Sequence, residues 1–271
     1  MEITSPANPR VKHLVALRRR RARDQAAVTL VEGYAELDLA LAAGARPRSV
    51  YHCPELAGGD PRGVLSRVAG LGAEVIRVSP AVFGKIAYRQ APDGWLAVLP
   101  APPTDLARLT VGGRPLVLIC EGVEKPGNLG AILRTADAAG VTAVIAADPA
   151  TDWGNPNVVR ASKGTVFSVK VAAAESGEVL RWVTGAGLAL VAATPDDGVP
   201  LTGADLTGPV ALAVGSESTG LPPDWLARAD VRVRIPMFGR VDSLNVSASA
   251  AIMMYEAVRQ RLAAGVMRLP A

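Results

Sequence analysis

The sequence predicts an α/β protein in two parts, a small α/β domain followed by a larger domain built on a parallel sheet. Short, continuous apolar stretches alternate with helical patterns in the second part, which is typical of a parallel sheet covered by helices on both faces. A Pro- and Gly-rich linker at residues 101–112 divides the chain into domains at 1–100 and 113–271. The 271 residues, 49% of them hydrophobic, suffice for a packed core in each domain.

Hydrophobic periodicity predicts the elements of the first domain. Apolar residues at helical spacing indicate two amphipathic helices, and short apolar runs bounded by turn residues indicate three strands. The predicted helices span residues 11–24 and 32–44, and the predicted strands span 49–53, 73–79 and 93–99.

The second domain alternates strands and helices more plainly. Its predicted strands span residues 115–123, 142–148, 188–194, 209–217 and 231–236, and its clearest helices span 128–140 and 244–265. Gly140 ends the first of these helices. The basic residues of the last helix gather toward its C-terminal end, where the helix dipole favours positive charge.

The sequence lacks the signatures of several classes of protein. It has no uncharged apolar run of 18 residues and no signal-peptide pattern, so we expect a soluble, cytoplasmic protein without a membrane segment. The loops GxxxxGK[ST] of triphosphatases, GxGxxG of dinucleotide enzymes and GxSxG of hydrolases are also absent.

A metal site is not expected. Cys53 and Cys120 have neither CxxC spacing nor a histidine cluster beside them, and the only histidines are His13 and His52. We therefore predict two buried thiols. Aromatic residues make up only 4% of the chain and the tryptophans are scattered, so we expect packing roles and no base-stacking platform for Trp95, Trp153, Trp182 and Trp225.

Positive charge is concentrated near the N-terminus. Residues 1–105 hold 14 Lys and Arg against 10 Asp and Glu, whereas residues 106–271 hold 15 of each, so the first part carries the whole net charge of +4. Within residues 1–23, seven basic side chains face only Glu2. Such an arm suits a phosphate-backbone partner, and a solvated tail is the alternative reading.

Three stretches each begin where a predicted parallel strand ends, which is the edge at which open α/β sheets bind ligands. They are EGVEKPGNLGAILRTADAAG from Glu121, AVGSESTGL from Ala213 and IPMFGRVDSLNVSAS from Ile235. Taken alone, the third stretch is an ordinary capped helix start, and any one glycine is more often a tight turn. The convergence of all three predicts a binding site.

The motifs within these stretches resemble those of the SpoU/TrmH RNA 2′-O-methyltransferases. The resemblance rests on Asn128-x-Gly130-x-x-x-Arg134, on Gly215-x-Glu217-x-x-Gly220-Leu221, and on Ile235-Pro236-Met237 with Ser243-Leu244-Asn245-Val246-Ser247. It covers residues 113–265 or so, with the motifs in the family's order. It implies a deep trefoil knot, a bent S-adenosylmethionine bound within it, and a homodimer whose interface includes the C-terminal helix.

The resemblance also implies roles for individual residues. Asn128 and Arg134 take the catalytic positions. Because arginine stays protonated, we favour a clamp on the RNA phosphate that stabilises the developing alkoxide, over a literal base. Glu217, Gly220 and Asn245 are expected either to hold the knot loops or to contact RNA. The expected cofactor residues are Ala193, Thr194, Gly215, Ile235, Met237, Ser243 and Leu244.

The first domain resembles the substrate-binding domain of many family members, which folds like certain RNA-binding ribosomal proteins. We therefore expect ribosomal RNA of the 23S type as substrate, for maturation or for antibiotic resistance. The expected RNA-contacting residues are Arg18, Arg19, Arg20, Arg21, Arg160 and Lys163. A non-catalytic RNA-binding or ribosome-assembly protein and a transfer-RNA 2′-O-methyltransferase are the alternatives.

Overall fold

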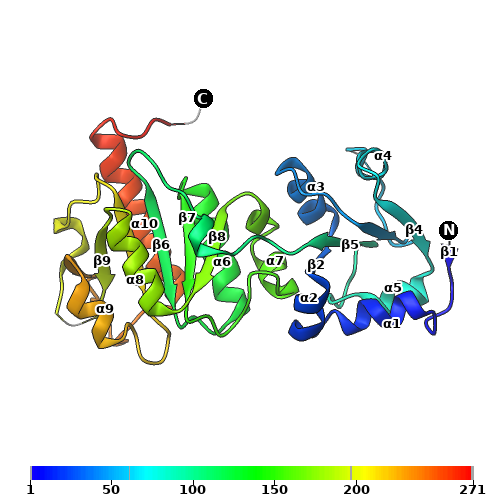
Figure 1. Cartoon of the computed structure of the whole chain (residues 1–271), viewed down its shortest axis with the longest axis horizontal. Helices are drawn as coiled ribbons and strands as arrows, with labels where there is room; N and C mark the ends of the chain where they lie inside the picture. Colours follow the sequence, from blue (N-terminus) through cyan, green and yellow to red (C-terminus); the bar gives the residue numbers. More distant parts are fainter. Residues whose placement is uncertain (1, 61, 196, 270–271) are drawn as a thin grey trace. The chain divides into compact units, whose positions relative to one another are not determined.

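The computed structural model describes residues 2–60, 62–195 and 197–269, which form two compact units (Figure 1). Unit 1 contains the chain up to Pro102 together with Asp152–Ser168, and unit 2 contains Pro103–Thr151 and the chain from Val169 onward. The chain therefore passes between the units three times. This division differs from the expected continuous block 113–271, because one segment from the middle of that block lies in the other unit.

Unit 1 is built on a mixed five-stranded sheet in the order β1-β4-β3-β5-β2, in which β5 runs antiparallel to β3 and β2. Its strands are β1 (Glu2–Ile3), β2 (Val28–Glu32), β3 (Ser49–His52), β4 (Glu74–Val78) and β5 (Trp95–Pro100). Its helices are α1 (Pro9–Ala16), α2 (Arg20–Ala26), α3 (Tyr34–Ala42), α4 (Val64–Gly70), α5 (Pro80–Ile86) and α7 (Pro156–Ala161), with the 3₁₀ helix η2 (Thr165–Phe167). Leu14 of α1 and Phe83 of α5 pack on one face of this sheet with Leu30 and Ile76.

The helix predicted over residues 11–24 is wrong in one respect, because the structure breaks it between α1 and α2. Arg19 takes an extended conformation at the break, with φ −87° and ψ 134°. The buried Arg23 donates from Nη1 to the carbonyl oxygens of Leu17 at 3.3 Å and Arg18 at 3.0 Å. An arginine that reads as part of an exposed basic arm therefore stabilises the corner between two helices.

Segment 152–168 accounts for an unusual property of β2. This strand lies at the edge of its sheet, yet all five of its residues are buried. Edge strands expose backbone groups unless another element covers them. Here α7 packs against β2, and Thr29 donates from Oγ1 to the carbonyl oxygen of Gly154 at 2.6 Å.

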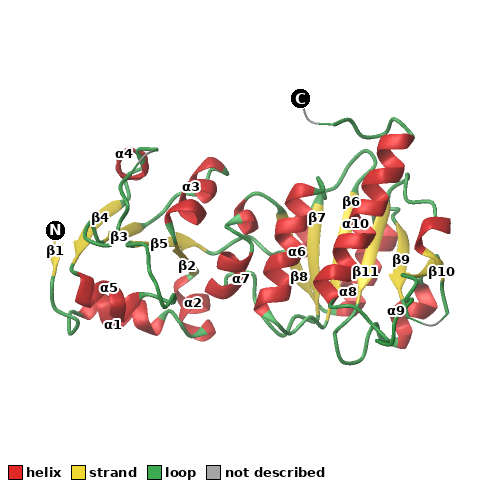
Figure 2. Ribbon diagram, turned by 180° about the vertical axis from the view of Figure 1, so that it is seen from behind, coloured by secondary structure: helices red, strands yellow, loops and turns green. Residues whose placement is uncertain are grey.

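Unit 2 confirms the predicted parallel sheet, with seven strands in the order β10-β12-β9-β11-β6-β7-β8 and parallel pairing throughout (Figure 2). The strands are β6 (Leu116–Glu121), β7 (Ala143–Ala147), β8 (Lys170–Ala174), β9 (Ala189–Ala193), β10 (Val199–Pro200), β11 (Val210–Val214) and β12 (Val231–Arg234). The helices are α6 (Pro126–Ala138), α8 (Ser176–Gly185), α9 (Pro223–Arg228) and α10 (Val246–Ala263), with η1 (Leu106–Arg108) and η3 (Leu201–Gly203). The five predicted strands are present, whereas β8 and β10 were not predicted.

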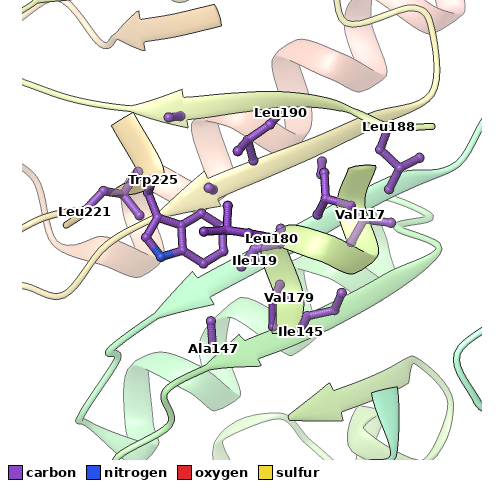
Figure 3. Packing of buried hydrophobic residues seen from close by; sticks show 14 of the residues in the cluster. Val117, Ile119, Ile145, Ala147, Val179, Leu180, Leu188, Leu190, Leu221 and Trp225 are labelled. Atoms are coloured by element: carbon purple, nitrogen blue, oxygen red, sulfur yellow. The ribbon is translucent and has the colours of Figure 1, made fainter. Parts of the chain in front are cut away.

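Helices cover both faces of this sheet, as the continuous apolar strands predicted. On one face, Val117 and Ile119 of β6 pack with Leu180 of α8 and Trp225 of α9 (Figure 3). Because side chains alternate along a strand, Leu118 faces the other side, where α6 and α10 pack against the sheet and each other. The predicted packing role of the tryptophans is confirmed: Trp95, Trp153 and Trp225 are buried, and Trp182 packs against the core.

The basic end of α10 does more than complement the helix dipole. Arg261 is buried, and its guanidinium donates to four carbonyl oxygens, those of Leu206, Arg114, Pro115 and Gly208. Burial lowers the pKa of this side chain. Arg261 therefore ties the last helix to the start of β6 and to the loop before β11, which fixes α10 against the sheet.

Both cysteines are free, buried thiols, as predicted. Burial raises the pKa of Cys120 to about 12. Among the described residues, no helix is both long and apolar enough to cross a membrane.

Candidate active site

The carboxyl ends of the central strands of unit 2 lie at one edge of the sheet, because all of these strands are parallel. The loop after β6 leads into α6, the loop after β11 leads into α9, and residues 235–245 connect β12 to α10. Each of the three predicted motif stretches therefore begins at this edge, which is where open α/β sheets bind ligands.

A hydrogen-bonded chain of polar side chains joins the three loops. Asn128, in the first turn of α6, donates from Nδ2 to Oε1 of Glu217 in the loop after β11. Its Oδ1 accepts from Nδ2 of Asn245 at 3.2 Å, and Asn245 is the N-cap of α10. Oδ1 of Asn245 in turn accepts from the backbone N–H of Ser247 at 3.0 Å and from its Oγ at 2.5 Å. We call Asn128, Glu217, Asn245 and Ser247 the Asn128 cluster.

The Asn128 cluster uses both ends of each amide. Because Asn128 donates to a carboxylate and accepts from another amide, its side chain has one orientation that satisfies both neighbours. Hydrogen bonds to a charged group contribute about 1.5–3 kcal/mol each when they are shielded from water. Only the bond to Glu217 involves a charged group, and Glu217 and Asn245 are exposed, so we expect each bond of the cluster to contribute about 1 kcal/mol or less. The cluster therefore fixes loop positions more than it stabilises the fold.

Gly215 permits a close approach of backbone at the end of β11. A Cβ atom built at this position would lie 2.0 Å from the carbonyl carbon of Gly220 and 2.2 Å from the backbone nitrogen of Leu221. No side chain fits there. Gly220 itself has φ +67°, which favours glycine, and its N–H donates to the carbonyl oxygen of Ser216 at 3.0 Å. The loop carrying Glu217 is therefore a tight turn folded back on the strand end.

The other residues expected to bind the cofactor lie at the ends of β9 and β12. Ala193 is the last residue of β9, and Thr194 donates its backbone N–H to the carbonyl oxygen of Val233 at 2.9 Å. Ile235 and Leu244 are half-buried at the two ends of the loop that connects β12 to α10. Met237 and Ser243 are exposed within it. The structure thus places these residues on neighbouring loops of the same edge.

Arg134 extends from the exposed side of α6, six residues after Asn128. The opposite side of the helix, with Leu129, Ile132 and Leu133, is buried. Because the apolar side anchors the helix, the guanidinium is held by a rigid element while its charge stays accessible to an anionic ligand.

Glu121 is a candidate that the motifs did not single out. It is the last residue of β6, is 7% exposed, and lies at the same edge as the motif loops. Burial raises the pKa of its carboxyl group, and the neighbouring charge of Asp148 raises it further. A glutamate ending an otherwise apolar strand was the one signal in the sequence that could have found it.

The expected RNA-contacting residues lie in unit 1, and they differ in how firmly the unit holds them. Arg18 donates from Nη2 to the carbonyl oxygens of Lys85 at 3.0 Å and Ala87 at 2.7 Å, and Arg20 faces Asp152 at 3.9 Å. Arg19 and Arg21 are exposed, as are Arg160 of α7 and Lys163 just after it. The basic arm is therefore a pair of helices and not a flexible tail.

No metal-binding group emerges from the described part of the chain. Within residues 2–60, 62–195 and 197–269, no three His, Cys, Asp or Glu side chains are grouped closely enough to hold an ion. The polar groups of the site are amides, the Ser247 hydroxyl, the carboxyl groups of Glu217 and Glu121, and an arginine. The amides and the hydroxyl suit hydrogen bonding, and the arginine suits anion binding.

Comparison with known proteins agrees with this arrangement. The family described as SpoU rRNA Methylase matches residues 115–255, and the MRM3-like substrate binding domain matches residues 8–97. The 23S rRNA (uridine(2479)-2′-O)-methyltransferase of Streptomyces viridochromogenes is 34% identical over 204 residues, which span 73% of this chain and 71% of that protein.

Solved structures match almost the whole chain. The crystal structure of an RNA 2′-O ribose methyltransferase is 44% identical, with a TM-score of 0.84 over 97% of this chain and 100% of the other. An AdoMet-bound rRNA methyltransferase from Sinorhizobium meliloti is 31% identical, with a TM-score of 0.87 over 96% of this chain and 97% of the other. Together with the motif loops and the substrate-binding domain before them, these matches show that the chain belongs to the SpoU rRNA methylase family.

Proposed function

We propose that this protein transfers a methyl group from S-adenosylmethionine to the 2′-hydroxyl of one nucleotide in ribosomal RNA. The observation that carries this proposal is the Asn128 cluster, which joins three loops of the SpoU family at the carboxyl edge of the sheet. The relatives that match along the chain support the same reaction, since their names describe rRNA and RNA 2′-O-methyltransferases.

The residues at this edge suit the cofactor. Residues 235–245 form no strand or helix, so neither a sheet nor a helix uses their backbone groups, and Gly215 has no Cβ in the turn after β11. Backbone hydrogen bonds to an adenosyl group contribute about 0.5–1.5 kcal/mol each. We assign this binding to Ala193, Thr194, Gly215, Ile235, Met237, Ser243 and Leu244.

S-adenosylmethionine supplies a methyl group on a positively charged sulfur and leaves as a neutral thioether. The protein then has to position the ribose hydroxyl and manage its proton. We assign Arg134 to the RNA phosphate and to the negative charge that develops on the 2′-oxygen, because a guanidinium keeps its own proton. Asn128 fixes the start of the helix that carries Arg134, and Glu217 and Asn245 hold Asn128.

Unit 1 is assigned to RNA binding, with Arg160 and Lys163 included. The expected domains are 1–100 and 113–271, joined by a linker at 101–112. We change this division in one respect and assign segment 152–168 to the RNA-binding part, because it packs with unit 1. The housekeeping or resistance role and the trefoil knot stay predictions from the family resemblance.

A homodimer fits the surface of unit 2. Most of the exposed large apolar side chains described in unit 2 lie on α10 and on the loop before it, where a monomer would leave them in water. They include Met237, Phe238, Val241, Ile252 and Tyr255. Phe238 is 98% exposed, which suits a residue that inserts into a second copy. This surface supports a homodimer, and action on ribosomal RNA, as in the relatives that match the chain, supports a cytoplasmic location.

Two measurements test the proposal in sequence. Isothermal titration of the protein with S-adenosylmethionine should show one site per chain, which a non-catalytic RNA-binding protein would lack. Primer extension at low nucleotide concentration on ribosomal RNA treated with protein and cofactor should then stop at one 2′-O-methylated position. Methylation of transfer RNA alone would favour the alternative substrate, and cofactor binding without any methylation would contradict the proposal.

A further inference from the structure

Segment 152–168 is held on unit 1 by an ion pair between residues far apart in the sequence. Arg23 donates from Nη2 to Oδ2 of Asp152 at 2.7 Å, and the two side chains are 4% and 17% exposed. Arg20 also faces this carboxylate, with its Nε 3.9 Å from Oδ2. Because the pair is nearly buried, removing one charge would leave the other without its closest opposite charge in a poorly solvated place.

The segment meets unit 1 at two further points. Thr29, fully buried on β2, bonds to the carbonyl oxygen of Gly154. Gly164 has φ +86°, and a Cβ there would lie 2.8 Å from the carbonyl oxygen of Glu36 on α3. The ion pair thus secures the start of the segment, and the close approach at Gly164 secures its second half.

Two exposed basic side chains lie between the ion pair at Asp152 and the close backbone contact at Gly164. Arg160 is in the last turn of α7, and Lys163 follows it with φ +58°, a left-handed conformation that usually takes glycine or asparagine. Non-glycine residues in this conformation concentrate at functional sites. A lysine there has its backbone held in a defined conformation, and its side chain is exposed to solvent.

We propose that the Arg23–Asp152 ion pair is a positioning device that holds segment 152–168 on unit 1, so that Arg160 and Lys163 form one RNA-binding surface with that unit. The inference rests on the proposed function, since it assigns RNA phosphates as the ligand of these cations. Arg23 and Asp152 are positioning residues: they act through the segment and do not touch the reacting atoms.

The test is a double-mutant cycle on the full-length protein, with a 23S rRNA fragment as substrate. Asp152→Asn should raise the KM for RNA about tenfold and leave kcat and the Kd for S-adenosylmethionine unchanged. Lys163→Ala should raise KM several-fold in the parent protein but by less than about twofold in the Asp152→Asn background, because the cation is already misplaced. Asp24→Asn is the matched control, since Asp24 is an exposed carboxylate paired with the neighbouring Arg20 at 3.6 Å.

Hydrogen exchange gives a readout that does not depend on activity. Asp152→Asn should speed amide exchange in segment 152–168 and leave α6 unchanged. If this variant does not fold, Asp152→Glu carries the same test, because it keeps the charge opposite Arg23 and moves the carboxylate by one methylene from the position that pairs at 2.7 Å.

Additive effects of Asp152→Asn and Lys163→Ala, or an unchanged KM in a folded Asp152→Asn protein, would overturn the positioning role. Failure of the parent protein to methylate or bind the RNA would overturn the proposed function instead, so the two failures are distinguishable.

Discussion

The Asn128 cluster of unit 2 and segment 152–168 of unit 1 both lie within the part of the chain that matches the SpoU family, yet different interactions stabilise them. The cluster is a chain of exposed or half-buried polar side chains between three loops, and it buries almost nothing. The segment is held by a nearly buried ion pair and by buried apolar residues such as Val158 and Val159. Under the proposed function, the loops joined by the polar cluster serve the reaction and the packed segment serves RNA binding.

The largest effect is expected at Arg134. Arg134→Ala should lower the rate of methylation by about 10²–10³, by analogy with the loss of one preorganised donor to a developing negative charge. Arg134→Lys keeps the positive charge but loses the bidentate hydrogen bonds that a guanidinium can donate, so it should recover part of the rate. Single-turnover methylation with saturating RNA and cofactor measures both. A near wild-type rate for Arg134→Ala would remove this residue from the reaction.

The next effect is expected on folding, at Gly215. Gly215→Ala places a methyl group against the backbone of Gly220 and Leu221, so we expect unit 2 to lose about 1–3 kcal/mol of stability through overpacking. Thermal unfolding followed by circular dichroism measures the loss. Gly203→Ala is the control, because a Cβ there meets no atom within 4 Å. Equal melting temperatures for the two variants would show that the turn is not as tight as described.

A smaller effect on stability is expected at Lys163, where substitution should not lower the stability of unit 1. Lys163→Gly relieves the left-handed backbone, so stability should stay equal or rise by up to about 1 kcal/mol, while RNA affinity falls because the ammonium is lost. Thermal unfolding and filter binding of an rRNA fragment measure the two effects. Lys163→Asn, which also tolerates this conformation, should behave alike. A variant that loses stability together with affinity would place Lys163 among the packing residues.

The smallest effect is expected from the exposed arginines of α2 and the turn before it. Arg19→Ala should lower the salt slope of RNA binding by about 0.7–0.9 if the side chain contacts one phosphate. Arg18→Ala should differ, because two carbonyl oxygens of its own unit already hold its guanidinium, and unit 1 should lose stability. Binding measured across a salt series separates the two. An unchanged slope for Arg19→Ala would make that side chain a bystander.

The parallel sheet could be predicted because its strands are buried on both faces and read as apolar runs. The strands of unit 1 were harder: β2 reads VTLVE, and nothing local shows that α7 covers it. It could likewise be predicted that Asn128, Glu217 and Asn245 lie at one edge of the parallel sheet, because each belongs to a motif that follows the end of a strand.

Contacts over long sequence separations were beyond prediction. Arg23 stands in a run of arginines that reads as a solvated or RNA-binding arm, and its partner Asp152 lies in another predicted domain. From the sequence, Arg261 is expected to be an exposed residue that complements the helix dipole. In the structure it is buried, and its guanidinium donates hydrogen bonds to four carbonyl oxygens. In each case the side chain's environment comes from segments that no local pattern connects.

The central claim is that the polar cluster serves the reaction and the packed segment serves RNA binding. Steady-state kinetics of methylation, with RNA concentration varied for Asn128→Ala and Lys163→Gly side by side, test it most directly. The account predicts that Asn128→Ala lowers kcat with little change in the KM for RNA, whereas Lys163→Gly raises that KM and leaves kcat unchanged. Equal changes in both constants for both variants, or the reverse pattern, would contradict it.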